Sequence, residues 1–481
     1  MAADAIGLRE VLFQSITDMA PGAAIAASIP AGAGFAGGSL PLAVLLALVA
    51  SLLTASCVGE LAARIPAAGS MATFAAEGLH PSIGFLVAWG YTFAAALLPP
   101  LVLIQLGFTI ATTIHSEWSA YPIGLWWPWV ILGAAVIFYV GVMGIQTSTY
   151  LGSVLGAFEI VVFLVVGVLL VIHAGSHNTL QVFTTRYTPS AHRGMSGIIA
   201  GSIFTVLAFA GFEAATSLSE EARKPRQTVR RAVLLATAGV GALYVFTTYA
   251  VSVAYGPGSF AGFTGSGTAS WEGLTRSFFG VAWIFVFFAI VNSTVANANA
   301  GLNVVSRMAF AMGRIRVFPA RLATLGRRHR SPYQAITLST AATVGLALGL
   351  GLTYGTTNAF DMLGTGIVIV VAAVYIVIDA ACIGYFLRHR EQLNPLLHIF
   401  VPILGILTFV PVWLNAAGIK VFSFISALTA PVSYMGPVTA LWMLAGLIYL
   451  VLQYRIAPDR VAAVGRVYLD SEISSDSEQG V

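Results

Sequence analysis

Charged residues are scarce in this sequence: Asp, Glu, Lys and Arg make up 9% of 481 residues, whereas 58% are hydrophobic. Such a balance argues against a water-soluble domain and is typical of a protein that lies within a lipid bilayer. Cysteine is nearly absent, and both Cys57 and Cys382 fall inside apolar runs. We therefore expect neither a disulfide nor a cysteine-based metal site, and no disulfide-linked protein partner.

Several chemical signatures are also missing. The sequence has no histidine–carboxylate metal cluster, no nucleophile elbow and no phosphate-binding loop. We therefore expect no metal, no cofactor and no enzymatic activity. The first apolar run is too long for a cleavable signal peptide, and no small-residue cleavage site follows a basic start, so none is expected.

Long apolar runs are abundant. A membrane-spanning helix needs about 20 apolar residues. Twelve runs of suitable length lie near 9–34, 39–63, 82–113, 126–143, 151–173, 195–217, 230–255, 278–310, 334–353, 359–387, 397–418 and 431–454. We therefore predict an all-α integral membrane protein with about twelve transmembrane helices, in a single domain over residues 1–455. The polar remainder, 456–481, is expected to be a flexible cytoplasmic tail.

Basic residues gather on one side of this topology. With the amino terminus inside, only Arg186, Arg193, Arg276 and Lys420 of the 23 basic residues lie outside. This bias predicts that both termini are cytoplasmic, and it accounts for the net charge of +4 without nucleic-acid binding. The basic run at 327–330 is interpreted as a topology determinant. At the inner end of the second span, Glu60 is expected to pair with Arg64 one turn later.

The first apolar run carries Asp18, Pro21 and Gly22 near its middle. Pro21 has no N–H and its ring blocks the preceding turn, so the helix should break there. Broken backbone at membrane depth survives only where it is buried in protein or lines a cavity. We therefore predict that residues 18–23 face a binding cavity. Free N–H groups after Pro21 suit a carboxylate, and carbonyls freed at Ile16–Met19 suit an ammonium group.

The sixth span has a similar interruption, Phe209-Ala-Gly-Phe-Glu213. Phe209 or Phe212 either closes over a substrate as an aromatic gate or is ordinary packing. Interrupted spans in corresponding positions of two halves indicate the binding site of a secondary transporter. Breaks centred on Gly22 and Gly211 fit two repeats of five helices each.

These repeats comprise helices 1–5, over about 9–173, and helices 6–10, over about 195–387. Two additional helices follow over about 397–454. The assignment rests on the positions of the two breaks.

Glu159 is a third acid inside a predicted span, and nothing near it in the sequence can neutralise it. A charged carboxylate at the bilayer centre costs about 2.5–3.5 kcal/mol. A lone intramembrane acid is therefore a candidate proton site; the alternative is a structural acid that is protonated or hydrogen-bonded. In the eighth span, the oxygens of Ser293 and Thr294 offer an alternative site for a sodium ion.

Three stretches resemble the amino acid–polyamine–organocation transporter superfamily, and the resemblance covers nearly the whole chain. They are Asp18-Met-Ala-Pro-Gly-Ala23 with Glu60-Leu-Ala-Ala-Arg-Ile-Pro66, then Phe209-Ala-Gly-Phe-Glu213, and Asn297-Ala-Asn-Ala-Gly-Leu-Asn with Phe318-Pro319 and Ser331-Pro332. The resemblance implies a five-plus-five inverted repeat with helices 1 and 6 broken at mid-membrane, and transport by alternating access. It implies substrate contacts from Met19, Ala20, Pro21, Gly22, Ala23, Phe209, Ala210, Gly211 and Phe212.

The resemblance also bears on coupling. Glu159 looks aligned with a position where some proton-coupled relatives carry a lysine, and a glutamate there could load and release a proton too. Glu213 is either a gating or proton-sensing carboxylate or a cap of the broken helix. Two features depart from the superfamily pattern. The common glycine–x–glycine is Pro21-Gly-Ala23, and Asp18 is an added acid that could attract a cationic substrate and join in proton coupling.

The sequence thus predicts a secondary active transporter, namely a proton-coupled amino acid symporter in a bacterial cytoplasmic membrane. The alternative is a polyamine or organic-amine transporter, or an exchanger of an amino acid against an amine. A sodium-coupled symporter, a channel and a transport-like sensor are further alternatives. The expected partners are a small-molecule substrate, protons and the lipid bilayer, with neither nucleic acid nor an obligate protein partner.

Overall fold

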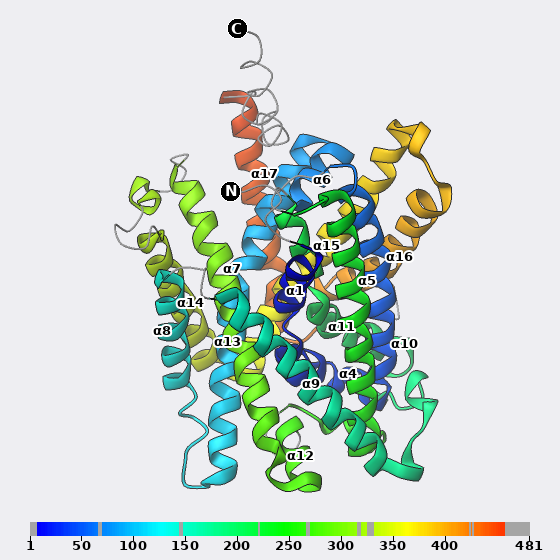
Figure 1. Cartoon of the computed structure of the whole chain (residues 1–481), viewed down its shortest axis with the longest axis vertical. Coiled ribbons are helices and arrows are strands. Elements are labelled where there is room, and N and C mark those ends of the chain that lie inside the picture. The colour runs from blue at the N-terminus through cyan, green and yellow to red at the C-terminus, as the bar shows by residue number, and fades with distance from the viewer. Residues whose placement is uncertain are drawn as a thin grey trace.

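The computed structural model describes residues 7–456 except 66–69, 144–147, 220–221, 266–269, 315–318, 325–330, 423–424 and 426–427. The loop at Pro66 and Gly69, the basic run at 327–330 and the tail from 457 lie outside these residues. The described chain forms a bundle of helices without strands (Figure 1).

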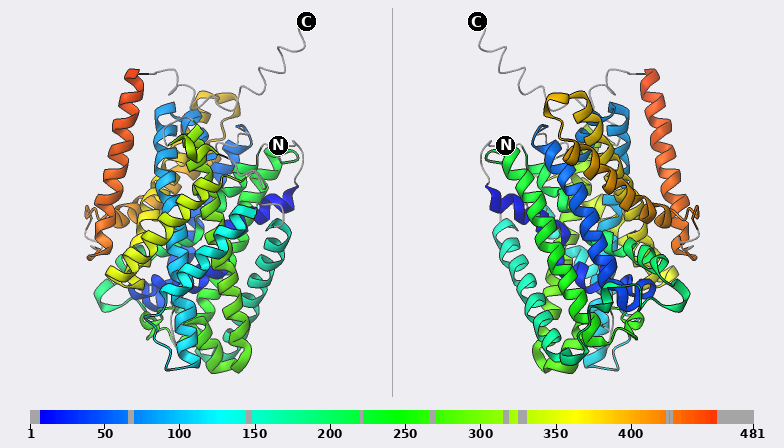
Figure 2. Two further views of the ribbon diagram at one scale, coloured as in Figure 1. Left: turned by 90° about the vertical axis from the view of Figure 1, so that its left-hand side faces the viewer. Right: turned by 90° about the vertical axis from the view of Figure 1, so that its right-hand side faces the viewer.

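The described part of the first half of the chain contains ten α-helices. They are α1 (Leu8–Met19), α2 (Pro21–Ala23), α3 (Ile29–Ala31), α4 (Ala33–Ala36), α5 (Leu40–Ala62), α6 (Ser70–Gly78), α7 (Pro81–Glu117), α8 (Trp127–Met143), α9 (Ser148–Ala174) and α10 (Met195–Phe209). The second half adds α11 (Pro225–Tyr255), α12 (Trp271–Phe279), α13 (Trp283–Arg314), α14 (Tyr333–Tyr354), α15 (Thr356–Arg388), α16 (Val401–Ala416) and α17 (Met435–Ile456). The short helices α6 and α12 lie at opposite ends of the bundle (Figure 1), and α17 stands at its edge (Figure 2).

Ten stretches of the described residues are long and apolar enough to cross a membrane. They correspond to ten of the twelve predicted spans. The fourth predicted span is the shorter apolar helix α8, and the first is divided into α1 to α4 by its break. The prediction of an all-α integral membrane protein is confirmed, while the count of twelve stays a prediction.

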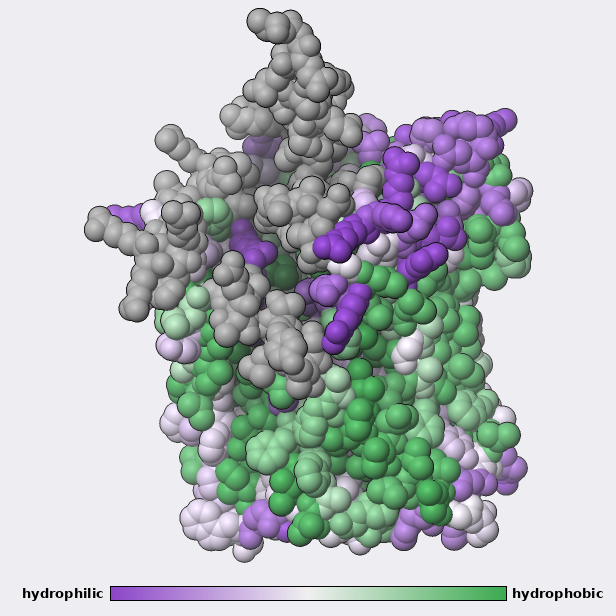
Figure 3. Space-filling view, viewed as in Figure 1, coloured by the Kyte–Doolittle hydropathy of each residue, from purple (hydrophilic) through white to green (hydrophobic). Residues whose placement is uncertain are grey.

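The surface of the bundle has the apolar band that a bilayer requires (Figure 3). On α9, Val161, Val165, Val168 and Ile172 recur at helical spacing, and each is between 44% and 69% exposed. In water such a stripe would be an aggregation hazard, but in a membrane it faces acyl chains. The opposite stripe of α9, which includes Glu159 and Phe163, is buried.

The first break lies at Ala20, which takes the left-handed conformation with φ 44° and ψ 69°. The sequence predicted that the helix breaks at Pro21 and centred the break on Gly22; the helix does break directly before Pro21, two residues before Gly22. Pro21 is the reason, because its fixed φ suits the first position of a new helix and disfavours helical backbone in the residue before it. Gly22 therefore lies inside the next helical turn, α2.

The second break is at Gly211, as predicted. Helix α10 ends at Phe209, Gly211 has φ 111°, and a 3-10 turn follows at Phe212–Leu218. A glycine is required for two reasons: the positive φ, and the close approach of the Asp18 backbone. A Cβ at position 211 would lie 2.9 Å from the Asp18 carbonyl carbon. The two breaks are thus in direct contact.

The predicted pair of Glu60 with Arg64 is wrong. Helix α5 ends at Ala62, so Arg64 does not continue its helical face. Glu60 instead pairs with Arg230 of α11, with 2.6 Å between Oε1 and Nη2, and Arg64 donates from Nε to Gln392. Residues from distant segments thus pair with Glu60 and Arg64, in place of the pairing within one helix that their spacing suggested.

Candidate functional site

A cavity of about 110 Å³ lies between the two breaks. It is smaller than the roughly 300–1,000 Å³ of pockets for drug-sized ligands, which suits a small solute. The residues lining it come from the break of helix 1 and from α7, α10, α13 and α15. They are Asp18, Met19, Ala23, Ala24, Ser28, Tyr91, Ala94, Ala95, Leu98, Leu101, Val102, Gln105, Leu207, Ala208, Ala210, Gly211, Asn297, Ala300, Gly301, Val304, Ile367 and Val371.

Asp18 is the charged residue of this lining, and no basic side chain contributes to it among the described residues. Two buried amides add acceptors. Gln105 donates from Nε2 to the Ala23 carbonyl at 2.9 Å, which leaves its Oε1 without a partner in the described chain. Asn297 Oδ1 likewise lacks a donor there. A buried acceptor without a donor is costly, so the cavity suits a ligand that brings several N–H groups.

The backbone at the first break offers little to a carboxylate. Pro21 has no N–H, and the Gly22 amide faces the Glu159 carboxyl group. Among the first three residues of the new helix, only the Ala23 N–H is therefore left to bind a substrate carboxylate.

The carbonyls predicted to be free are largely occupied. The Ala20 N–H donates to the carbonyls of Ile16 and Thr17, both at 3.2 Å. The Tyr244 hydroxyl donates to the Met19 carbonyl at 3.0 Å.

Glu159 lies behind the break rather than in the cavity lining. The stripe of α9 that carries it faces the protein interior, and the residue is 3% exposed. Its nearest polar neighbours are the Ser293 hydroxyl, the Gly22 amide and the Asn292 side chain. Within the described chain its Oε2 atom nevertheless has no hydrogen-bond partner.

Gly22 makes room for this carboxyl group. A Cβ at position 22 would lie 2.9 Å from Ser293 Cβ and 3.1 Å from Glu159 Oε2. Both distances are shorter than an ordinary van der Waals contact. The helix 1 break, α9 and α13 therefore meet at a point where only glycine fits without a shift of its neighbours.

The two hydroxyls of the alternative sodium site differ. Ser293 Oγ is buried beside Gly22 and has no partner among the described residues. Thr294 instead donates its hydroxyl to the Ile290 carbonyl of its own helix. This bond uses the Thr294 hydrogen and leaves the oxygen lone pairs, so both hydroxyl oxygens keep the capacity to bind a cation.

Glu213 is held by three donors. Its Oε1 accepts from the Tyr91 hydroxyl at 2.5 Å. Its Oε2 accepts from the Tyr375 hydroxyl at 3.0 Å and from the Gly211 N–H at 3.1 Å. Because the donors come from α7, α15 and the break itself, this carboxyl group ties two neighbouring helices to the break. Its role as a gate, a proton sensor or a cap stays a prediction.

Comparison with known proteins shows to which family the chain belongs. The family model for amino acid permeases matches residues 10–457. The chain belongs to the amino acid permease family. The permeases of this family are transporters, so the prediction that the chain is not an enzyme is confirmed, as is its membership of the wider superfamily. It is a multi-pass membrane protein that transports amino acids or amines.

Three relatives illustrate the range of the family. The permease is 26% identical to the low-affinity putrescine importer PlaP of Escherichia coli, over 79% of its own length and 82% of the relative. It is 25% identical to the aromatic amino acid transport protein AroP of Corynebacterium glutamicum, over 67% and 70%. It is 29% identical to the lysine-specific permease LysP of Escherichia coli, over 45% and 44%.

The predicted substrate contacts of the permease divide into two groups. Met19, Ala23, Ala210 and Gly211 line the cavity, as does Asp18. The other predicted contacts do not line it; they are Ala20, Pro21, Gly22, Phe209 and Phe212.

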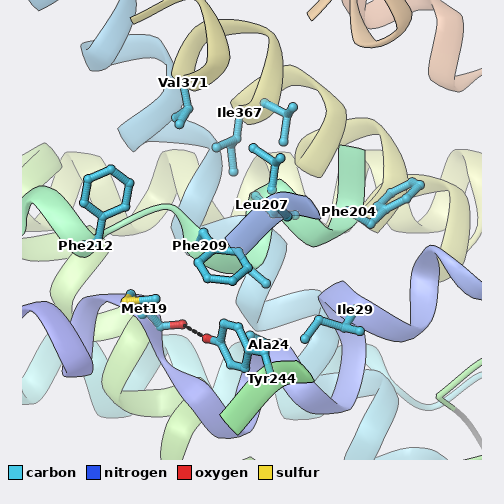
Figure 4. Packing of buried hydrophobic residues seen from close by; sticks show 14 of the residues in the cluster. Met19, Ala24, Ile29, Phe204, Leu207, Phe209, Phe212, Tyr244, Ile367 and Val371 are labelled. Carbon is cyan, nitrogen blue, oxygen red and sulfur yellow. Dashed lines mark hydrogen bonds between the residues drawn. The ribbon is translucent and has the colours of Figure 1, made fainter. Parts of the chain in front are cut away.

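The two phenylalanines pack inside the bundle (Figure 4). Phe209 meets Tyr244 edge to face at 5.3 Å, and Phe212 packs on Tyr375 at 5.1 Å between ring centroids. Both rings are fully buried. Their role as an aromatic gate stays a prediction.

Sequence reasoning missed four side chains that shape the site of this permease. Gln105 and Tyr91 come from α7, where the sequence draws attention to the pair Pro99-Pro100 rather than to these two residues. Tyr244 and Tyr375 act on the breaks through single hydroxyl groups. Asn297 was foreseeable, because it belongs to the amide-rich stretch of the eighth span. Amides in lipid need partners, so such a helix is expected to face the interior.

Proposed function

We propose that this permease is a secondary active transporter that moves a small organic amine together with a proton, by alternating access. The transporter domain spans 1–455 and is built from inverted repeats over about 9–173 and 195–387. Both termini lie in the cytoplasm of a bacterial cell, and the tail from 456 is an extension of that domain. The helix 1 break forms the substrate site and touches the coupling site.

One observation supports proton coupling above all: the buried, unpartnered oxygen of Glu159 beside Gly22. A proton on this carboxyl group removes a charge that no neighbour neutralises, and it supplies an O–H donor for the break. Its release leaves a carboxylate that favours a rearranged backbone around Gly22. Proton loading at Glu159 can thus bias the same break that holds the substrate.

Three acceptors support an amine as the substrate. The Asp18 carboxyl group supplies the negative charge, and the free oxygens of Gln105 and Asn297 supply further acceptors. An ammonium group has three donors to satisfy them. The described lining contains no cation for a substrate carboxylate, and the PlaP relative is a putrescine importer.

An amino acid is the second candidate substrate. The Ala23 amide at the start of the new helix could hold a carboxylate, and AroP and LysP are amino acid permeases by name. Sodium coupling is a third candidate, with the oxygens of Ser293 and Thr294 as ligands, but the unpartnered oxygen of Glu159 supports a proton more directly. If the coupling ion is a proton, replacing sodium by choline in the uptake medium leaves uptake unchanged.

The test is uptake into proteoliposomes under an inward proton gradient, with labelled putrescine. Unlabelled putrescine should compete, and neutral amino acids should not. Asp18→Asn should weaken apparent affinity roughly 10- to 150-fold, as expected for loss of a hydrogen bond to a charged group of about 1.5–3 kcal/mol. Asp361→Asn is the matched control, since Asp361 lies in a span but outside the cavity lining.

Each part of the proposal can fail separately. Competition by neutral amino acids but not by putrescine would make the amino acid the substrate. Uptake that ignores the proton gradient would remove the coupling role of Glu159, whatever the substrate.

A further inference from the structure

A second cavity of the permease lies where α5 ends and α11 begins. Its volume is about 640 Å³. The residues lining it come from these two helix ends and from the turn that follows α15. They are Ala63, Arg64, Arg226, Gln227, Arg230, Arg231, Leu234 and Gln392. Four arginines thus surround one cavity.

The positive charge of this arginine cavity is not balanced within the described chain. Glu60 pairs with Arg230, but no carboxylate of the described residues pairs with Arg64, Arg226 or Arg231. Glu391 precedes the lining residue Gln392 and does not itself line the cavity. Among the described residues, the guanidinium groups of Arg226 and Arg231 therefore have no carboxylate partner and can meet an anion.

Helix polarity adds to this surplus. Helix α11 begins at Pro225, so Arg226, Arg230 and Arg231 occupy its first two turns. The N-terminal end of a helix carries partial positive charge, so a cation in the first turn, here Arg226, costs about 0.3–1 kcal/mol. A topology signal needs basic residues only somewhere in the loop, not gathered at a helix start around a cavity. An anion in the cavity would offset this cost.

The depth of the cavity indicates which anion it meets. Both α5 and α11 belong to membrane-spanning stretches, Ala33–Ala62 and Pro225–Tyr255. Because this end closes both spanning stretches, we place it at the level of the lipid headgroups; Figure 3 shows hydrophilic residues above the apolar band. Leu234 lines the cavity on the side of the membrane, and the neighbouring Leu235 is 52% exposed. A ligand with a phosphate and an acyl chain matches the arginines on one side of the cavity and the leucines on the other.

We propose that the arginine cavity binds the phosphate of an anionic phospholipid headgroup. Arg226 and Arg231 contact the phosphate oxygens, which the fork of a guanidinium group suits well. The acyl chain leaves past Leu234 into the bilayer. The bound lipid ties the start of α11 to the end of α5, beside the salt bridge between Glu60 and Arg230.

The test measures binding of fluorescent phosphatidylglycerol to the full-length permease in a neutral detergent. The double variant Arg226→Gln/Arg231→Gln should bind about thirtyfold more weakly, at about 1 kcal/mol for each arginine. Arg455→Gln, an exposed arginine at the end of α17 outside the cavity, is the matched control and should bind like wild type. Raising the salt concentration should weaken binding to the wild type, a measurement that needs no variant.

Three results would overturn the proposal. The first is equal binding of phosphatidylcholine and phosphatidylglycerol by the wild type. The second is unchanged phosphatidylglycerol binding by the double variant. The third is displacement of the lipid by inorganic phosphate at equal concentration, which would identify a site for a free anion. All three are independent of the transported substrate.

Discussion

Gly22→Ala is the most informative single change in this permease, because it adds one methyl group where the helix 1 break meets Glu159. That methyl carbon would lie 2.9 Å from Ser293 Cβ, 3.1 Å from the Ala289 carbonyl oxygen and 3.1 Å from Glu159 Oε2. The neighbours come from two different helices, so relief needs movement of more than one element. Overpacking of this kind costs about 1–3 kcal/mol. If this cost destabilises one of the two alternating-access states and not the other, the population of the destabilised state falls roughly 5- to 150-fold relative to the other.

The assay is initial uptake under a proton gradient, measured together with thermal unfolding in detergent. We expect a loss of uptake in the stated range for Gly22→Ala. Gly156→Ala is the matched control, because it lies on the same helix as Glu159 and its added Cβ would meet nothing within 4 Å. Wild-type uptake and stability in Gly22→Ala would refute the close packing on which the coupling argument rests.

Three other variants test the frame around the site. Tyr375→Phe removes one of the hydrogen-bond donors to Glu213. We expect the free energy of unfolding to fall by about 1.5–3 kcal/mol, measured as a lower unfolding temperature. An unchanged unfolding temperature would show that this hydrogen bond contributes nothing to stability. Phe209→Ala removes the ring packed on Tyr244 and should lower the free energy of unfolding by about 3–5 kcal/mol. If the variant is as stable as wild type but leaks substrate faster, Phe209 is a gate instead. Glu60→Gln breaks a salt bridge between α5 and α11 and should lower thermal stability more than any single substitution among the exposed residues of α17.

Much of the fold was predictable from the sequence. Apolar runs of spanning length are a property of the chain itself, so ten of the twelve predicted runs correspond to helices long enough to cross a membrane in the described chain. The break at Gly211 was also predictable, because a glycine between two phenylalanines and close to an acid, Glu213, interrupts an otherwise apolar span. The position of the first break was displaced because Pro21 acts on the residue before it, Ala20, which takes the left-handed conformation.

The candidate site was less predictable, because its parts come from distant segments. Asp18 and Glu159 stood out as acids in apolar runs, and the structure brings both close to the helix 1 break. Tyr375 gave no such signal, since a tyrosine in a span is ordinary, and only the fold aims its hydroxyl at Glu213. Similarly, helical spacing suggested Arg64 as the partner of Glu60, but the fold brings Arg230 of α11 to Glu60 instead.

The central claim is that Glu159 carries the proton that moves with the substrate. The most direct measurement uses proteoliposomes with a trapped pH-sensitive dye and no initial pH gradient. Adding substrate outside should acidify the interior with the wild type. With Glu159→Gln the interior pH should stay constant, while exchange of labelled for unlabelled substrate continues. Substrate-dependent acidification in the Glu159→Gln variant would contradict the account and assign the coupling proton to another group.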